Sequence, residues 1–174
     1  LDEGVRLRQS RVKLPVMVMN SATSDYQQLI DNDLEPVIFN VEGLIKFREV
    51  CSFNGLENYP IHIKLDTGMH RLGFSVDEIA ELCEKIDTRE TKVKSVFSHL
   101  VGSDEEKFDE FSKEQAVLFV KMAETIIKKL GYSVMQHILN SAGTERFPEY
   151  HFNMVRIGIG LYGEGISKNL KQVS

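Results

Sequence analysis

The sequence has few cysteines, no long apolar run and no basic cluster, and each absence excludes a class of protein. Cys51 and Cys83 have neither metal-site nor disulfide-framework spacing, so we expect free thiols, no metal and a reducing cytoplasm. No apolar run could cross a bilayer, and the first residues do not form an export signal. The net charge is -5 and no basic run is interleaved with aromatics, which disfavours nucleic acid and membrane partners.

What is present is the composition of one globular domain. Of 174 residues, 42% are hydrophobic and 27% are charged, which is enough apolar material for a buried core. The chain starts without Met and ends in a polar, patternless stretch, so we expect it to have been cut from a longer protein.

Stretches rich in branched residues alternate with segments of helical length. Strands are expected at residues 15–19, 36–41, 61–66, 94–100, 136–140 and 154–162. Capping boxes are expected to start helices at Ser24 with Gln27, Ser75 with Glu78, and Ser103 with Glu106. Strict alternation predicts a parallel sheet, because parallel neighbours need a long crossover.

A doubly wound open sheet and a (β/α)8 barrel both satisfy this alternation. No glycine-rich dinucleotide fingerprint follows an expected strand, which disfavours the open nucleotide-binding sheet. A whole barrel needs about 250 residues. We therefore expect an α/β fold that is a partial (β/α)8 barrel of the TIM type, about strands three to eight with the intervening helices.

Polar residues collect where the expected strands end. Lys64 lies on the polar side of one strand, and the turn that follows contains Gly68 and Gly73, which would let the backbone aim Arg71 back across the strand end. The next strand ends carry Ser98 and His99, Asn140 and Ser141, and Arg156 and Gly158. In a barrel these ends face one mouth, so we expect an active site there rather than capped strands with surface polar groups.

Some of these residues have simpler explanations. His99 precedes two carboxylates, a pattern that fits a metal site less well than the first turn of a helix. Its ring could stack on a flat ligand, or bond to backbone in the core. Asn140 and Ser141 suit a nest for an anion and, almost as well, an ordinary helix N-cap.

The last expected strand alternates an apolar set, expected to pack on the core, with a set that contains Gly158 and Gly160. Glycine costs strand stability, so two on one face indicate that a ligand occupies the space beside the backbone. A phosphate suits this place, since the end of strands seven and eight commonly holds one in this barrel.

Together these motifs resemble the bacterial alanine racemases, the barrel-type pyridoxal phosphate (PLP) family. The resemblance is carried by residues 62–73 (HIKLDTGMHRLG), residues 97–105 (FSHLVGSDE), and NSA at 140–142 followed by NMVRIGIGLYG at 153–163. It implies a cytoplasmic isomerase that interconverts L-alanine and D-alanine for peptidoglycan in the cell wall. It also implies that the whole protein is a homodimer.

The resemblance assigns catalytic roles to Arg71 and Lys64. Arg71 would contact the phenolic oxygen of PLP, and Lys64 would be carbamylated to hold Arg71, unless it is a plain lysine paired with an acid. His99 would lie against the pyridine ring. Arg156 would face the ring nitrogen, which would stay unprotonated because a guanidinium only donates; the weaker electron sink favours proton removal and return.

The phosphate of PLP would be bound by Ser141 and by the backbone N–H groups of Gly158 and Ile159, with Asn140 beside the cofactor. His70 stands where the family usually has a second glycine, a variant that we associate with racemases fused to a cell-wall ligase.

The family's Schiff-base lysine and opposing tyrosine match no residue of this chain. We therefore expect residues 1–163 to be a truncated PLP-binding barrel domain and residues 164–174 a linker toward an absent C-terminal β domain. The fragment alone is expected to be inactive and to self-associate through open sheet edges. The alternatives are a non-catalytic PLP-binding barrel module, an unrelated barrel acting on sugar phosphates, and a structural fragment.

Overall fold

A computed structural model describes residues 1–86 and 89–163; the predicted linker at 164–174 lies outside the described residues. Five parallel strands form one sheet in sequence order. They are β1 Met17–Val18, β2 Glu35–Ile38, β3 Tyr59–Lys64, β4 Thr91–Phe97 and β5 Met135–His137. The α/β prediction is confirmed, and each of these strands ends earlier than expected.

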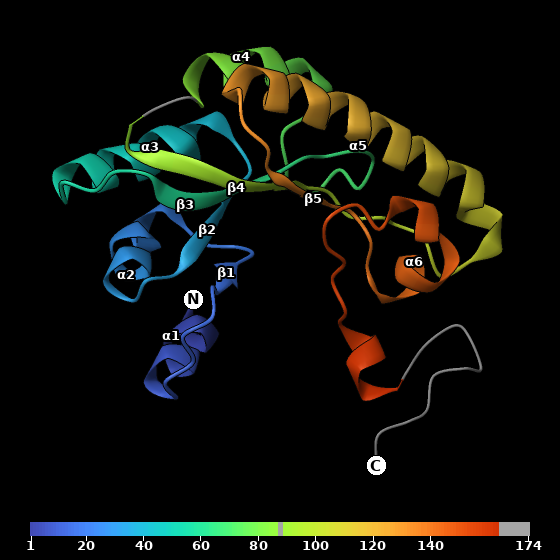
Figure 1. Cartoon of the computed structure of the whole chain (residues 1–174), viewed down its shortest axis with the longest axis horizontal. Coiled ribbons are helices and arrows are strands. Elements are labelled where there is room, and N and C mark those ends of the chain that lie inside the picture. Colours follow the sequence, from blue (N-terminus) through green and yellow to red (C-terminus); the bar gives the residue numbers. More distant parts are fainter. Residues whose placement is uncertain (87–88, 164–174) are drawn as a thin grey trace.

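Helices connect the strands. They are α1 Asp2–Gln9, α2 Tyr26–Asp31, α3 Val41–Phe53, α4 Ile79–Lys85, α5 Asp109–Leu130 and α6 Ser141–Arg146, with short 3-10 turns η1 Thr23–Asp25, η2 Val76–Glu78, η3 Glu106–Phe108, η4 Pro148–Tyr150 and η5 Ile159–Tyr162. Figure 1 shows α3, α4 and α5 covering one side of the sheet, while α1 and η5 descend on either side of its other face. The described helices include none with the length and apolar character needed to cross a membrane.

Of the three expected capping boxes, one is confirmed. The backbone N–H and the hydroxyl of Ser75 both donate to Glu78, at 2.8 and 2.9 Å. The box expected at Ser24 does not form; instead the backbone N–H of Ala22 donates to the Asp25 carboxylate at 3.1 Å, which is half of a capping box. The one expected at Ser103 is wrong, because its hydroxyl donates elsewhere.

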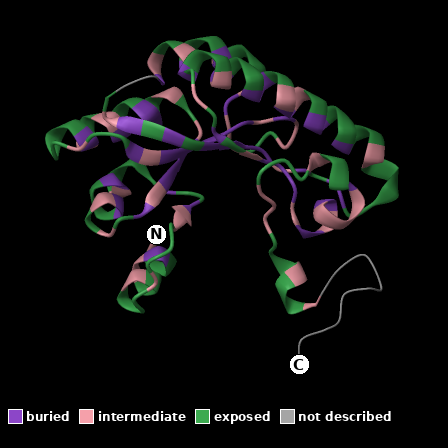
Figure 2. Ribbon diagram, viewed as in Figure 1, coloured by how far each residue is buried: buried purple, intermediate pink, exposed green. Residues whose placement is uncertain are grey.

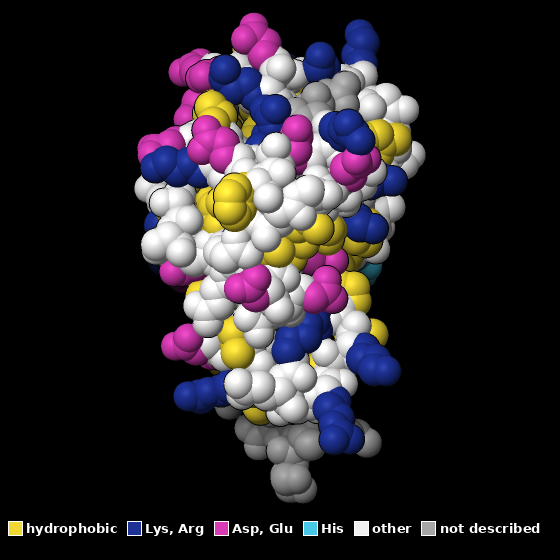
Figure 3. All heavy atoms as spheres, turned by 90° about the vertical axis from the view of Figure 1, so that its left-hand side faces the viewer, with side chains coloured by type: hydrophobic (Ala, Val, Ile, Leu, Met, Phe, Trp, Pro, Cys, Tyr) yellow, Lys and Arg dark blue, Asp and Glu magenta, His cyan; other side chains and the backbone are white. Residues whose placement is uncertain are grey.

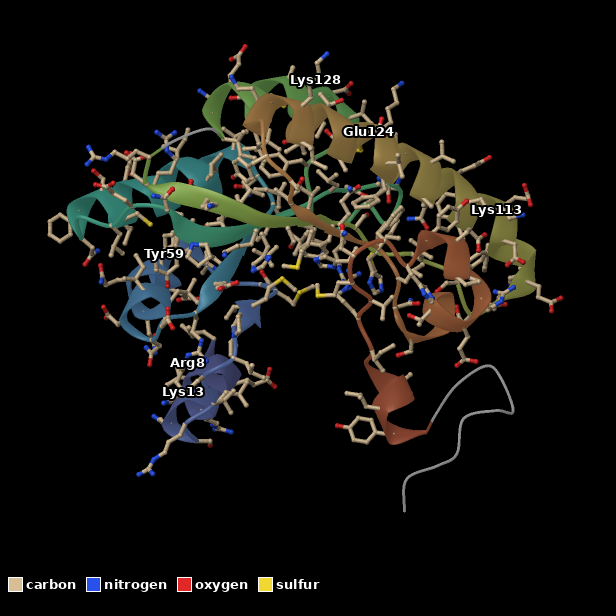
Figure 4. The ribbon with its side chains drawn as sticks, in the orientation of Figure 1. Arg8, Lys13, Tyr59, Lys113, Glu124 and Lys128 are labelled. Carbon is tan, nitrogen blue, oxygen red and sulfur yellow. The ribbon has the colours of Figure 1, made fainter. Side chains whose placement is uncertain are left out.

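The core lies between the sheet and the helices. In Figure 2 the buried colour follows the strands and the inner sides of the helices. The ring of Phe47 is fully buried and packs edge-on against Tyr26 and Tyr59, with centroid distances of 5.1 and 5.5 Å. The hydroxyl of Tyr59, labelled in Figure 4, donates to the carbonyl of Leu34 at 3.0 Å.

The outer surface is mixed in charge. Lys113, Glu124 and Lys128 project from the outer side of α5 in Figure 4. Figure 3 shows basic and acidic side chains interspersed over the face on the left of Figure 1, with hydrophobic side chains between them.

The strand expected at residues 154–162 is wrong: among the described residues no strand follows β5. The segment stays beside the sheet through a backbone bond from the N–H of Arg156 to the carbonyl of Leu139, at 3.1 Å. At Gly158 the backbone (φ -107, ψ -101) leaves the extended region, and η5 begins. The N–H groups of Gly158 and Gly160 donate to a side chain, so they are lost to any strand ladder.

Only part of the apolar set of that segment packs on the core as expected: Val155 does, whereas Ile157 is 40% exposed. Ile159 and Leu161 are 63% and 66% exposed. These side chains and Tyr162 belong to a 3-10 turn, in which residues no longer alternate between two faces.

One register shift decides which side chains of β4 face inward. Ile61 pairs with Val93, but His62 pairs with Ser95, so Lys94 is passed over and stays exposed. A bulge of this kind re-aims the side chains that follow it. It places Ser95 on the same face as His62, away from the helices.

Candidate functional site

The turn after β3 is held by one carboxylate. Asp66 accepts bonds from the backbone N–H groups of Gly68 and His70, each at 3.0 Å. Burial is the largest single effect and raises the pKa of Asp66, but these bonds and the neighbouring His70 together outweigh it, so the pKa is lowered. Gly73 has φ +131, and a Cβ there would lie 2.6 Å from the backbone nitrogen of Asp66. The turn thus requires glycine at this position, as predicted, and it presents Arg71 on the surface.

Arg156 is fixed at the ends of β4 and β5. Its guanidinium donates to the carbonyl oxygens of Ser98 and Ile138, at 2.6 and 3.2 Å, and to Nδ1 of His137. Its cation also lies over the ring of Phe97, with 5.1 Å to the centroid. Burial lowers the pKa of Arg156 to about 10, which still leaves it protonated at neutral pH.

His99 follows β4 and touches Arg156, with 3.3 Å between Nδ1 and the guanidinium. Burial, and after it the positive charges of Arg156, Lys64 and Arg71 in that order, lower the pKa of His99 to about 4. Its carbonyl accepts a bond from the side chain of Gln115 on α5, at 3.2 Å. The imidazole is therefore neutral and positioned at neutral pH.

Lys64 ends β3 and is only 6% exposed. Burial lowers its pKa, and the charges of Arg71 and Arg156 lower it further, while Asp66 raises it. Neither Lys64 nor Arg71 forms a hydrogen bond or ion pair with any residue the structure describes. The predicted pairing of Lys64 with a neighbouring acid is therefore not made within this part of the chain, and the site carries positive charge that an anionic ligand would balance.

Asn140 and Ser141 begin α6. Asn140 is its N-cap, since its side-chain oxygen accepts from the N–H of Gly143 at 2.9 Å. The hydroxyl oxygen of Ser141 accepts from the N–H groups of Gly158 and Gly160, at 2.9 and 3.2 Å. The hydroxyl of Ser141 and the backbone of this last segment thus lie together at the start of α6, and the anion nest stays a prediction.

These groups surround one pocket of about 500 Å³ at the carboxyl ends of β4 and β5. Six of the predicted site residues line it: His99, Asn140, Ser141, Arg156, Gly158 and Ile159. Arg71 and Lys64 do not line it, but their charges act on His99 beside it. A Cβ on Gly158 would meet only the Ser141 hydroxyl, at 4.0 Å, so the backbone there is open to a ligand.

Sequence reasoning missed the buried residues that support this pocket, His137 and Gln115. His137 is fully buried, stacks on Phe97 with a centroid distance of 4.8 Å, and binds Arg156. Its place directly before the apolar pair Ile138 and Leu139 was a usable signal. Gln115 lies on a long amphipathic helix and gave no signal distinct from its neighbours.

The parallel sheet, with a cationic pocket at the carboxyl ends of its strands, defines an α/β protein of the barrel type. Over the described ranges, no group of three or more His, Cys, Asp or Glu side chains could hold a metal ion. The sequence pattern of the family "Alanine racemase, N-terminal domain" matches residues 1–165. The chain belongs to this family.

Individual curated relatives of the chain are also alanine racemases. The chain is 30% identical to alanine racemase 1 of Oceanobacillus iheyensis, covering 99% of this chain and 46% of that protein. It is 32% identical to the alanine racemase of Syntrophobacter fumaroxidans, covering 97% of this chain and 44% of that protein. The chain thus spans less than half the length of the curated relatives it matches.

Solved structures show the same arrangement. The alanine racemase of Clostridium difficile is 27% identical and superimposes with a TM-score of 0.85, over 97% of this chain and 44% of that one. The Bacillus anthracis alanine racemase, solved with bound L-Ala-P, is 28% identical with a TM-score of 0.80, over 97% and 44% of the two chains. The five parallel strands match part of the alanine racemase barrel domain.

Proposed function

We propose that this chain is part of a PLP-dependent alanine racemase that interconverts L-alanine and D-alanine for peptidoglycan synthesis in the cytoplasm. The observation that carries the proposal is the convergence of six predicted residues on one pocket, with two further cations beside it. Membership of the alanine racemase family supports the same activity. Two free cysteines, Cys51 and Cys83, fit a reducing compartment.

The donor set fits PLP. Ser141 and the N–H groups of Gly158 and Ile159 would hold the phosphate, with Asn140 beside them, and the neutral ring of His99 would lie against the pyridine ring. When bound, PLP withdraws electrons from the alpha carbon of an amino acid and so makes its proton acidic.

Arg156 would face the pyridine nitrogen. Its guanidinium has donors only and stays protonated at neutral pH, so it can hold this nitrogen by a hydrogen bond but does not transfer a proton to it. That arrangement restrains the electron demand of the ring, which favours simple removal and return of a proton over other outcomes.

Arg71 and Lys64 would assist catalysis, with Arg71 on the phenolic oxygen. Because burial and two neighbouring cations lower the pKa of Lys64, more of its amine is neutral, and this is the form that adds to carbon dioxide with loss of a proton. The carbamate would carry the negative charge that Arg71 lacks as a partner. A carbamate signal in ¹³C NMR with labelled bicarbonate, absent in Lys64→Gln, tests this; no signal would leave Lys64 as a plain lysine.

The activity is tested on the full-length protein by PLP titration, followed by deuterium exchange at the alpha carbon of alanine. Binding and exchange are expected, and Arg156→Gln should reduce exchange while Arg48→Gln, which pairs with Glu90 at a distance from the pocket, should not. The absence of both PLP binding and deuterium exchange would refute the racemase. Binding without exchange would favour the alternative, a non-catalytic PLP-binding barrel module.

We also propose that these 174 residues do not racemise alanine by themselves, since none of them matches the family's cofactor lysine or opposing tyrosine. Measurable turnover by the isolated chain would refute this. The whole protein is proposed to be a homodimer and the isolated chain to self-associate, which exposed apolar side chains such as Leu14 (73%) and Leu161 (66%) support. Light scattering that finds a monomer in either case would contradict that part.

A further inference from the structure

Four polar side chains, three buried and one partly buried, cross the sheet beneath the pocket. Glu35 on β2, His62 on β3, Ser95 on β4 and His137 on β5 lie on the inner face, and we name them the polar row. Nε2 of His62 lies 2.7 Å from the Glu35 carboxylate, and Nδ1 lies 2.7 Å from the Ser95 hydroxyl. The same hydroxyl lies 3.0 Å from Nε2 of His137, whose Nδ1 meets Arg156.

This row is too deeply buried for water to replace its bonds. His62, Ser95 and His137 are 4%, 0% and 0% exposed, and the Glu35 side chain is 15% exposed. Polar groups at such depth are costly unless each finds a partner. Every ring nitrogen of the two histidines has one.

The chemistry of the end groups sets the direction of the bonds. Arg156 can only donate, so Nδ1 of His137 carries no proton and its Nε2–H donates to Ser95. In the neutral form of the His62 ring that this arrangement requires, Nδ1 accepts a bond from the Ser95 hydroxyl. Nε2–H of His62 in turn donates to the carboxylate of Glu35, which only accepts when ionised. All donors point the same way, from a cation beside the pocket to an anion across four strands.

We propose that the polar row is a positioning device: it keeps the proton of His137 on Nε2, so that Nδ1 stays an acceptor that fixes Arg156 at the pocket. If the proton moved to Nδ1, a ring N–H would face a guanidinium N–H and Arg156 would have to turn away. Glu35, His62 and Ser95 thus act on Arg156 through His137, without touching the pocket.

The register shift between β3 and β4 supports a specific role for this row. Without it, Lys94 would stand opposite His62, and an ammonium cannot accept the bond from Nε2–H of His137. The shift replaces that lysine by a hydroxyl, the one small group that both accepts and donates.

The test compares Ser95→Ala with Ser112→Ala in the full-length protein. Both serines are fully buried, but the Ser112 hydroxyl has no hydrogen-bond partner among the described residues, so its removal is a matched control. Ring ¹⁵N shifts in ¹⁵N-histidine-labelled protein, without PLP, report which nitrogen is protonated. The solvent exchange of the Arg156 guanidinium protons reports how firmly that side chain is held.

We expect His62 and His137 each to be protonated on Nε2 in the parent and in Ser112→Ala. In Ser95→Ala both ring signals should move, and guanidinium exchange should become about fivefold faster, as for the loss of one net hydrogen bond. A parent His137 protonated on Nδ1, or unchanged rings and exchange in Ser95→Ala, would overturn the proposal. PLP binding does not enter this test, so a failure of the proposed cofactor function would be recognised separately.

Discussion

His137 should make the protein less stable in mildly acidic solution. Burial, and after it the charge of Arg156, lower its pKa in the folded chain from 6.5 to about 3. In the unfolded chain the same imidazole is hydrated and takes up a proton near its ordinary pKa. Below that pH the unfolded state binds more protons than the folded state, so the free energy of unfolding falls as the pH falls.

The size of the effect follows from linkage. From pH 6.5 down to about pH 4.5 the folded imidazole stays neutral, while the unfolded one becomes fully protonated. One group of this kind contributes up to ~1.4 kcal/mol per pH unit, which amounts to about 2 kcal/mol over this window. The contribution of the neutral His137 to the free energy of unfolding is fully present above the ordinary pKa of histidine. It is lost progressively as the pH falls towards the lowered pKa of the folded state.

The assay is urea unfolding at several pH values, for the parent and for His137→Asn. The asparagine oxygen can replace Nδ1 as the acceptor for Arg156 and does not titrate, although its missing bond to Ser95 lowers the stability at every pH. Other titrating groups are common to both proteins, so the difference in slope belongs to His137. Equal slopes between pH 6.5 and about 4.5 would show that the folded imidazole titrates normally and would refute the buried, neutral histidine.

Three further predictions concern the turn, the nest and the core. Gly73→Ala should destabilise the chain by roughly 3 kcal/mol or more in urea unfolding, because its Cβ would lie 2.6 Å from a backbone atom at φ +131. Gly55→Ala, where φ is +65 and the space is open, should cost about 1 kcal/mol, and equal losses for the two variants would contradict the close approach at Gly73. Ser141→Ala should weaken PLP binding by the full-length protein about tenfold in fluorescence titrations, since one charge-assisted bond is removed, and unchanged affinity would exclude Ser141 from the phosphate site. Phe47→Ala should cost about 3–5 kcal/mol by urea unfolding, because its ring is fully buried, and a loss below about 1 kcal/mol would contradict that packing.

The sequence was sufficient for features that depend on local chemistry. Alternation of strands and helices predicted the parallel sheet, and glycine spacing predicted the turn that carries Arg71. The residues near strand ends were brought together because parallel strands share one carboxyl edge. His99 and Arg156, which are far apart in sequence, meet there at 3.3 Å.

The last segment could not be predicted in the same way. Gly158 and Gly160 were taken to indicate a ligand beside the backbone, which stays a prediction, and the alternation around them was wrongly taken for a strand. Whether an N–H joins a ladder or a side chain depends on what lies opposite, and here Ser141 lies opposite. Local sequence patterns cannot predict which of these two acceptors the N–H group binds, because Ser141 is 17 residues away from Gly158.

The polar row could not be predicted for a second reason: the alternation of side chains along β4 is interrupted by a bulge. In β3 alternation places His62 and Lys64 on one face, and the structure agrees. In β4, alternation counted from Val93 would turn Lys94 inward, to the level of His62. The bulge reverses this and turns Ser95 inward, while Lys94 remains in solvent, where its charge needs no partner. Without the bulge, the ammonium of Lys94 would lie opposite the buried His62, and this burial cost arises only once β3 and β4 lie side by side.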